Sequence, residues 1–305
     1  MRIVFLGNFE VPFSTESHHA WTWEQMGHEV VRLQENRSTE GEVLLACEKN
    51  HTQIFQWTHT HGWPDFPAHM VDNIRAMGIK SFSYHLDRYW GIGSRQADYL
   101  SHPSFHLDYF FSTDGGNDEG WASKGINHIY MPPGVVAYAT HMGIPSSDNA
   151  VRVLFSGSVG YHLEYPFRPK MVETLQQNYG EHFKVRTGVR EEALNNLYAS
   201  AKVIVGDHIF AGAPLYVSDR LFETVGRGGF IIYPDTPGVT DKIPGLVTYR
   251  PQDTNDLIHK IDYYLDVAHE AERVERRNKA FEYVKAHGTY TNRLTEIQRI
   301  LMMGL

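Results

Sequence analysis

Short apolar runs alternate with helical patterns along the first half of the chain. Strand-like runs occupy residues 2–7, 29–33, 53–58, 80–85, 106–112 and 127–131. Between them, residues 15–26, 39–49 and 67–77 show the spacing of amphipathic helices. Strands that alternate with helices in this way predict a parallel sheet with helices on both faces.

The rhythm stops at residues 131–135, where two prolines and a glycine cannot continue a helix or a strand. After residues 145–149 a second series of the same kind begins. Its expected strands are 151–158, 183–187, 203–206, 230–233 and 245–249. Its expected helices are 166–179, 191–201, a short helix that carries Glu223, 254–287 and 292–302. We therefore expect two doubly wound, Rossmann-like α/β domains, over residues 1–146 and 147–291.

The most informative segment is 218–232, which reads as a short helix, two glycines and a buried strand. Arg220 and Glu223 are three positions apart in this helix and share a face. An arginine near a helix N-terminus suits a diphosphate, and a carboxylate suits the two hydroxyls of a ribose. The alternative is an ordinary helix–turn–strand joint whose charges are solvated.

The run from Ser218 through Arg220, Phe222 and Glu223, followed by Gly228-Gly229, resembles the donor-binding motif of GT-B glycosyltransferases. The resemblance is strongest to the branch typified by the spore maturation protein CgeB. It implies two domains that face a cleft, with helix 292–305 packing back on the first. It also implies a UDP- or GDP-type sugar as co-substrate, no permanently bound cofactor and no required metal.

The resemblance places further donor-binding residues in the second domain. Gly157 and Ser158 follow the first strand, as the Gly-Ser of the family does, and Arg168 and Lys170 fill the role of an arginine about ten residues later. The full set is Gly157, Ser158, Arg168, Lys170, Asp207, Ser218, Arg220, Glu223 and Thr224. For Glu223, an ion pair with Arg220 or Arg227 is the rival role.

Many retaining members of the fold keep a second glutamate eight positions before the first, and here that position is Leu215. The sugar and the stereochemical outcome, inverting or retaining, are therefore left open.

In the first domain the expected strand ends gather polar and aromatic residues. Acceptor-binding candidates are Asn8, His18, His59, Trp63 and Tyr89. An inverting transfer needs a base, for which Asp87 is the first candidate and His61 the second. Each of these residues also has a purely structural interpretation. His59 and His61 suggest a metal, but no third ligand follows at a suitable spacing, so we expect none.

The charge of the first domain helps to decide which acceptor is expected. Residues 1–146 hold 9 basic and 16 acidic side chains, which argues against DNA, because a duplex requires phosphate-neutralising cations. Compact relatives nevertheless resemble bacteriophage enzymes that glycosylate hydroxymethylated pyrimidines in DNA, and Arg75, Lys80, Arg88 and Arg95 could form a local basic strip. Modified DNA therefore remains one candidate acceptor, together with the hydroxyl groups of polysaccharides and small molecules.

No run of 18 apolar residues is present, so no membrane span is expected. The chain passes from Met1 directly into a strand and has the single cysteine Cys47, which predicts a cytoplasmic protein without a signal peptide, in the host cytoplasm if a phage encodes it.

The expected activity is transfer of a hexosyl or pentosyl group to a hydroxyl. A nucleotide-sugar epimerase and a non-catalytic nucleotide-sugar binder are the alternatives, and Leu215 argues against the epimerase because it supplies no acidic group near the sugar. The sequence does not indicate an oligomeric state.

Overall fold

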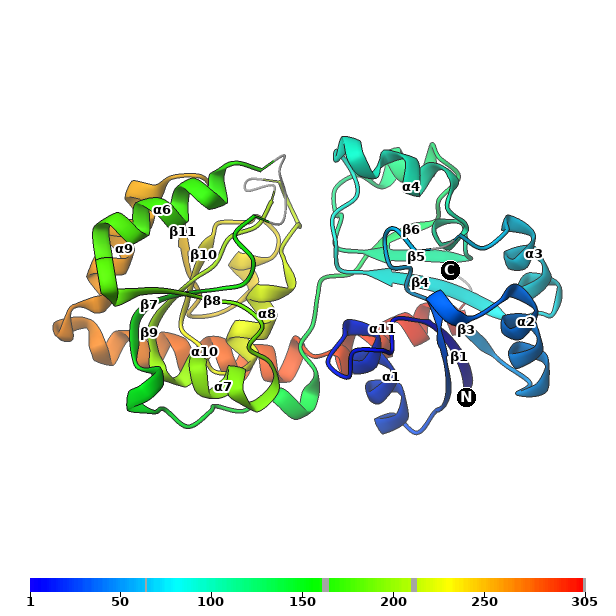
Figure 1. Ribbon diagram of the computed structural model, residues 1–305, viewed down its shortest axis with the longest axis horizontal. Helices are drawn as coiled ribbons and strands as arrows, with labels where there is room; N and C mark the ends of the chain where they lie inside the picture. Colours follow the sequence, from blue (N-terminus) through cyan, green and yellow to red (C-terminus); the bar gives the residue numbers. More distant parts are fainter. Residues whose placement is uncertain (64, 161–164, 210–212, 304–305) are drawn as a thin grey trace. The chain divides into compact units, whose positions relative to one another are not determined.

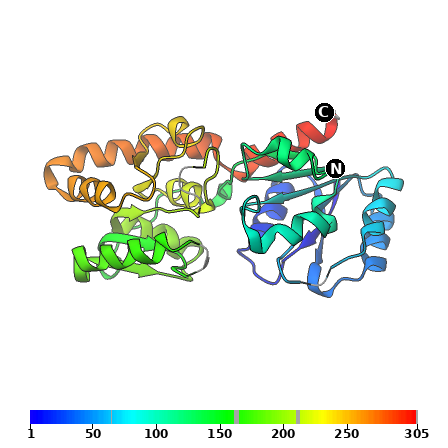
Figure 2. The same ribbon diagram turned by 90° about the horizontal axis from the view of Figure 1, so that it is seen from above.

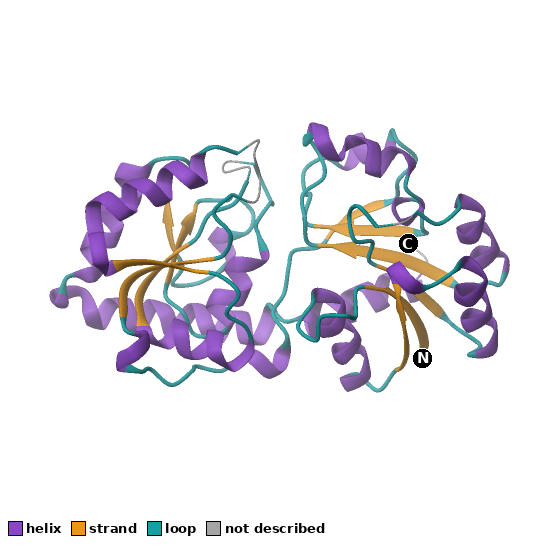
Figure 3. Cartoon of the chain, in the orientation of Figure 1, coloured by secondary structure: helices purple, strands orange, loops and turns teal. Residues whose placement is uncertain are grey.

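The computed structural model describes residues 1–63, 65–160, 165–209 and 213–303. The chain divides into two compact units, Met1–Pro132 with Tyr290–Leu305, and Pro133–Thr289. Each unit is a parallel sheet with helices on both faces (Figures 1 and 3). The expected fold class, two Rossmann-like α/β domains, is confirmed.

The first unit contains a parallel sheet of six strands in the order β2-β1-β3-β4-β5-β6. The strands are β1 (Arg2–Gly7), β2 (Glu29–Gln34), β3 (Ile54–Trp57), β4 (Lys80–His85), β5 (Tyr109–Ser112) and β6 (His128–Tyr130). Its helices are α1 (Thr15–Gln25), α2 (Glu40–Lys49), α3 (Ala68–Ala76), α4 (Gln96–Ser101), α5 (Asp118–Ala122) and α11 (Tyr290–Met303).

Alternate side chains of β1 explain why both faces of this sheet are covered. Val4 and Leu6 point into an apolar cluster with α2 and α3, whereas Phe5 stacks beside His19 of α1. Helix α11 packs against α1, so the first strand and the last helix belong to the same unit (Figure 2).

The second unit contains a parallel sheet of five strands in the order β11-β10-β9-β7-β8. The strands are β7 (Val151–Ser156), β8 (Phe183–Arg186), β9 (Ala201–Val205), β10 (Ile231–Pro234) and β11 (Val247–Tyr249). Its helices are α6 (Phe167–Tyr179), α7 (Glu191–Ser200), α8 (Asp219–Gly226), α9 (Thr254–Leu265) and α10 (Glu270–His287). In both sheets the order reverses beside the first strand, at β1/β3 and at β7/β9.

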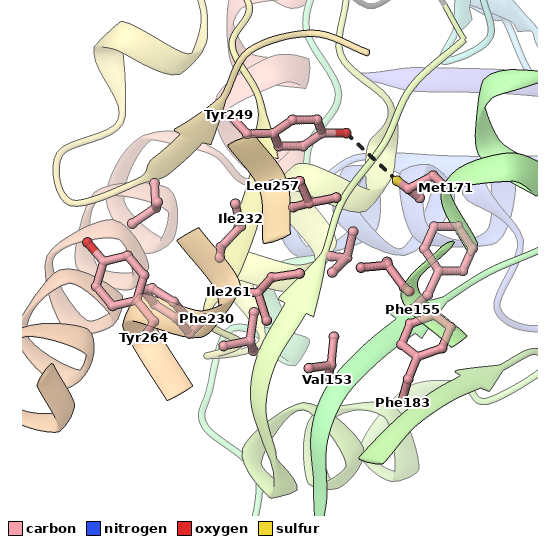
Figure 4. Close-up of a cluster of buried hydrophobic side chains, with 14 residues drawn as sticks. Val153, Phe155, Met171, Phe183, Phe230, Ile232, Tyr249, Leu257, Ile261 and Tyr264 are labelled. Atoms are coloured by element: carbon pink, nitrogen blue, oxygen red, sulfur yellow. Dashed lines mark hydrogen bonds between the residues drawn. The ribbon is translucent and has the colours of Figure 1, made fainter. Parts of the chain in front are cut away.

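One face of the second sheet packs on α6 and α9 through a single apolar cluster (Figure 4). Val153 and Phe155 of β7 contact this layer, which also includes Leu257 and Ile261 of α9. The hydroxyl of Tyr249 lies 4.0 Å from the sulfur of Met171. Continuous burial of the strands on both faces is what a parallel sheet requires.

The boundary between the units lies at Pro132–Pro133, whereas the sequence placed it after residue 146. The intervening segment is bound to α7: the Asn195 amide donates to the carbonyl of Ala139 at 3.0 Å, and the backbone N–H of Ile144 donates to Asn196 at 2.7 Å. Side-chain hydrogen bonds, which the proline pattern does not encode, decide where this segment packs.

Three elements differ from the expected pattern. The helix expected over 254–287 is divided at Asp266, which is extended and accepts a hydrogen bond from the backbone N–H of Ala268. The strand expected from 106 begins at Tyr109, because a 3-10 turn, η3 (Pro103–Phe105), precedes it. The short helices α4 and α5 were not expected, and both are too short to show a helical period.

Candidate functional site

Arg220 lies where the strand order of the second sheet reverses. Its Nε donates to the carbonyl of Ser156 at the end of β7 (2.8 Å), and its Nη1 donates to the carbonyl of Asp207 just after β9 (2.9 Å). The guanidinium carbon lies 4.9 Å from the centre of the Phe155 ring. Doubly wound sheets bind ligands at this reversal. Nη2 makes no hydrogen bond to the described residues, so it is available to an anion.

Gly157 lets the backbone approach Arg220 closely. Its φ is +135°, and a Cβ at this position would lie 2.4 Å from Nη2 of Arg220. A larger residue would therefore displace the guanidinium. The N–H of Gly157 donates to the carbonyl of Arg186 at 2.9 Å and is not available to a phosphate. Gly157 therefore contributes to the site by leaving room for the Arg220 guanidinium and by its positive φ, not by a hydrogen bond. Ser158 beside it is exposed.

Arg168 supports the site from within. Its Nε donates to Oδ2 of the fully buried Asp207 at 2.9 Å, and its Nη1 donates to the carbonyl of Ser158 at 3.2 Å. The Tyr165 hydroxyl donates to the other carboxylate oxygen at 3.1 Å. Burial raises the pKa of Asp207, and the charge of Arg168 opposes this shift. Arg168 thus has two internal partners, whereas Lys170 is exposed, and the assignment of both to the diphosphate stays a prediction.

Two residues of the α8 segment have other partners than expected. Ser218 occupies the N-cap position, but its side chain caps no backbone N–H, and its own N–H donates to the hydroxyl of Tyr233 at 2.9 Å. Thr224 is fully buried beneath the helix. The Ser218 hydroxyl lies 3.4 Å from the carbonyl of Asp207 and 3.2 Å from the Tyr233 hydroxyl, and burial keeps Thr224 from a ligand in this conformation.

Glu223 forms an ion pair with Arg227, which is the alternative role that the sequence left open beside ribose binding. Its Oε2 accepts from Nε of Arg227 at 2.6 Å, and Arg227 in turn donates to Oδ1 of Asn195 at 2.6 Å. Arg227 is 2% exposed, so this pair is internal. Oε1 of Glu223 accepts no hydrogen bond from the described residues, and the side chain is 18% exposed. Ion pairing through one oxygen therefore leaves the other available.

In the first unit, Glu16 lies at the sheet reversal. It belongs to the first turn of α1, which Ser14 caps by accepting from the N–H of Ser17 at 3.0 Å. A Cβ on Gly7, the last residue of β1, would lie 2.8 Å from Cγ of Glu16. The pKa of Glu16 is raised to about 7, mainly by burial, with smaller contributions from the nearby charges of Glu35 and Asp87.

The sequence analysis missed Glu16. The available signal was its position, in the first turn of a helix that follows a Gly-terminated strand.

The two base candidates from the sequence are accessible but paired. Asp87 follows β4, its side chain is 53% exposed, and its Oδ2 lies 3.5 Å from Nη1 of Arg95. The His61 side chain is 60% exposed, and its Nδ1 lies 2.9 Å from Oδ2 of Asp98.

The five acceptor-binding candidates do not form one surface. Asn8 and Trp63 are partly exposed, and the Asn8 side chain accepts from the N–H of Glu10 at 3.3 Å. His18, His59 and Tyr89 are buried. The Tyr89 ring packs edge-on against Phe105, so it has no free face for stacking on a sugar. Aromatic packing, the structural alternative, accounts for Tyr89.

Residues 148–299 match the family model described as glycosyl transferase-like. Across the whole chain, the fold is similar to that of a glycosyltransferase from Rickettsia africae, with a TM-score of 0.65, 11% identity, and coverage of 99% of this chain and 98% of that one. It is also similar to HepE from Anabaena in complex with UDP and glucose, with a TM-score of 0.63, 10% identity, and coverage of 99% and 100%.

An α1,3-fucosyltransferase aligns with a TM-score of 0.54, 12% identity, and coverage of 98% and 90%. No curated protein matches the sequence significantly. Among the described helices, none has the length and hydropathy of a membrane span. Residues 148–299 of this chain are thus similar to the glycosyl transferase-like family, within a chain whose two parallel-sheet domains have the fold of GT-B glycosyltransferases.

Proposed function

We propose that this protein is a glycosyltransferase that takes a sugar from a nucleoside diphosphate and transfers it to a hydroxyl group. The observation that carries the proposal is the position of Arg220. Two backbone carbonyls fix its guanidinium at the β7/β9 reversal, and Nη2 is directed toward the Gly157 backbone. A preorganised cation at this place stabilises the charge that develops on a departing diphosphate.

The donor site divides into contact and support residues. We assign the diphosphate to Arg220 and Lys170, and the ribose hydroxyls to Oε1 of Glu223. Arg168 and Asp207 hold the Ser158 backbone in place. The family match of this unit and the neighbour solved with UDP and glucose support a UDP- or GDP-type donor.

On the acceptor side we propose Glu16 as the base, ahead of Asp87 and His61. A pKa near 7 leaves about half of the Glu16 population ionised at neutral pH, which suits removal of a proton from a hydroxyl as it attacks the sugar. Asp87 is instead paired with Arg95, whose Nη1 lies 3.5 Å from Oδ2.

The structure favours a sugar or small-molecule hydroxyl over DNA as the acceptor. The basic strip considered from the sequence does not form, because Arg88 and Arg95 are buried and Arg75 is paired with Asp108. Lys80 is exposed, but it is the first residue of β4, so it lies at the opposite end of the sheet from the carboxyl ends of the strands. Duplex binding needs several exposed cations on one face.

Donor binding tests the proposal directly. Titration calorimetry with UDP and GDP should show that Arg220→Ala binds at least tenfold more weakly than the wild type, the loss expected for a charge-assisted hydrogen bond to phosphate. Arg250→Ala is the matched control, because that side chain is 76% exposed in the same unit. Equal affinity of Arg220→Ala and wild type, with unchanged folding, would remove Arg220 from the donor site.

Product analysis distinguishes the candidate functions. Release of nucleoside diphosphate only when an acceptor is present indicates transfer, isomerised sugar indicates an epimerase, and unchanged donor indicates a binding protein. Release that depends on hydroxymethylated DNA, rather than on sugar acceptors, would overturn the acceptor assignment.

A further inference from the structure

Two buried imidazoles lie against each other beyond the end of β3. The rings of His59 and His102 are 3.7 Å apart between centroids, with planes tilted by 23°. His59 is 8% exposed and His102 is 5% exposed. A neutral imidazole has a free ring-nitrogen lone pair and is the form that binds metal ions.

Glu35 orients His59. The indole N–H of Trp57 donates to Oε1 at 2.6 Å, and the backbone N–H of Thr60 donates to Oε2 at 2.9 Å. Because both groups can only donate, the carboxyl oxygens act as acceptors. Nδ1 of His59, 2.6 Å from Oε1, is therefore assigned as a third donor. This leaves the lone pair on Nε2, the arrangement in which a carboxylate commonly supports a metal-binding histidine.

His102 has a polar atom without a partner. Its Nε2 is buried and makes no hydrogen bond within the described part of the chain. The nearest charged group is Oδ1 of Asp65, at 3.3 Å, on a side chain that is 77% exposed. Nδ1 lies 2.7 Å from the hydroxyl oxygen of Ser104 and accepts from the Ser104 backbone N–H at 3.2 Å. A buried, unsatisfied ring nitrogen next to a solvent-accessible carboxylate is an environment that a cation would satisfy.

We propose that His59, His102 and Asp65 bind a zinc ion. Their candidate ligand atoms all lie within 4.8 Å of one another. Two imidazoles and one carboxylate form a set that suits Zn²⁺, with water in the fourth position. Binding at Nε2 requires the ring proton of His102 on Nδ1, where it donates to the hydroxyl oxygen of Ser104 in place of accepting from the Ser104 N–H. The ion joins the loop after β3 to the segment before η3.

The spacing argument from the sequence did not find this set, because it looked for a third ligand near His59 and His61. His102 comes from a separate segment that the fold brings beside β3. The site is independent of donor binding, so failure of one proposal leaves the other intact.

The test uses the full-length protein after chelator treatment and dialysis. Titration calorimetry with ZnCl₂ should show one ion per chain, and Co²⁺ should give the visible absorption of a tetrahedral site. Asp65→Ala and His102→Ala should each bind at least tenfold more weakly. His69→Ala is the matched control, because that histidine is 64% exposed and lies beside Glu40, outside the proposed set.

Zinc should also raise the thermal midpoint of the wild type but not that of Asp65→Ala. Asp65 is exposed, so this variant tests the site without removing buried packing. Absence of binding by the wild type, or equal binding by wild type, Asp65→Ala and His102→Ala, would overturn the proposal.

Discussion

At the residue scale, the carboxyl group of Glu16 lies partly buried beside Gly7, near the charges of Glu35 and Asp87. Its pKa is raised from 4.5 to about 7, with burial as the largest cause. The folded state therefore retains a proton between these pH values that the unfolded state has lost. Its contribution to stability is present below about pH 4.5 and is lost as the pH rises through about 7.

Glu16→Gln should remove this pH dependence. As the pH rises from 5 to 8, the unfolding free energy of the variant should increase relative to that of the wild type by on the order of 1–3 kcal/mol. Urea denaturation at both pH values measures the gain. Asp72→Asn is the control for an exposed carboxylate, because that side chain is 73% exposed. The same pH slope in Glu16→Gln and wild type would show that Glu16 has an ordinary pKa.

The sequence could identify a site residue only where its partners lie close to it along the chain. Arg220 and Glu223 could be singled out because they share one helix turn and one motif. The role of Arg168 could not, because its partner Asp207 is 39 positions away in the chain. Glu16 was missed for the same reason, since the charges of Glu35 and Asp87 reach it only through the fold.

At the element scale, the Arg168–Asp207 pair joins the start of α6 to the end of β9. Both side chains are buried, so removal of one leaves the other as an uncompensated charge. Arg168→Ala should lower the unfolding free energy by about 3–5 kcal/mol, and Asp207→Asn in that background should restore part of the loss.

Urea denaturation of the single and double variants measures this coupling. Arg152→Ala, which removes an exposed arginine from β7, is the control. Additive losses in the double variant would contradict a direct coupling between Arg168 and Asp207.

Hydrophobic periodicity predicted elements well where they were long and buried. The expected strands 2–7 and 80–85 coincide with β1 and β4. It failed where a single side chain decides the outcome: Asp266 divides the helix expected over 254–287 by capping the next turn. An aspartate side chain ends a helix only where the backbone after it turns so that it can cap the next N–H groups. The spacing of apolar residues does not show where this happens.

At the scale of the whole molecule, the alternation of strands and helices was sufficient to predict two doubly wound domains. Residues 133–146, which the sequence placed in the first domain, group with the second unit, where polar contacts with α7 hold them. Those contacts bind the segment to the second unit, and sequence composition alone could not assign it to either unit.

The final helix gives a test of how the two units depend on the chain ends. Helix α11 follows the second unit in sequence but belongs to the first, where Leu294, Ile297 and Leu301 are buried. Leu294→Ala should therefore destabilise the first unit by about 2–5 kcal/mol, the usual cost of a cavity in a core.

Leu257→Ala is the matched variant, because Leu257 is equally buried, at 0% exposure, in the core of the second unit (Figure 4). Hydrogen exchange should show faster amide exchange in β1 and β3 for Leu294→Ala, and in β9 and β10 for Leu257→Ala. If both variants accelerated exchange across both sheets alike, the units would unfold as one body. The last helix would then stabilise the whole chain rather than the first unit.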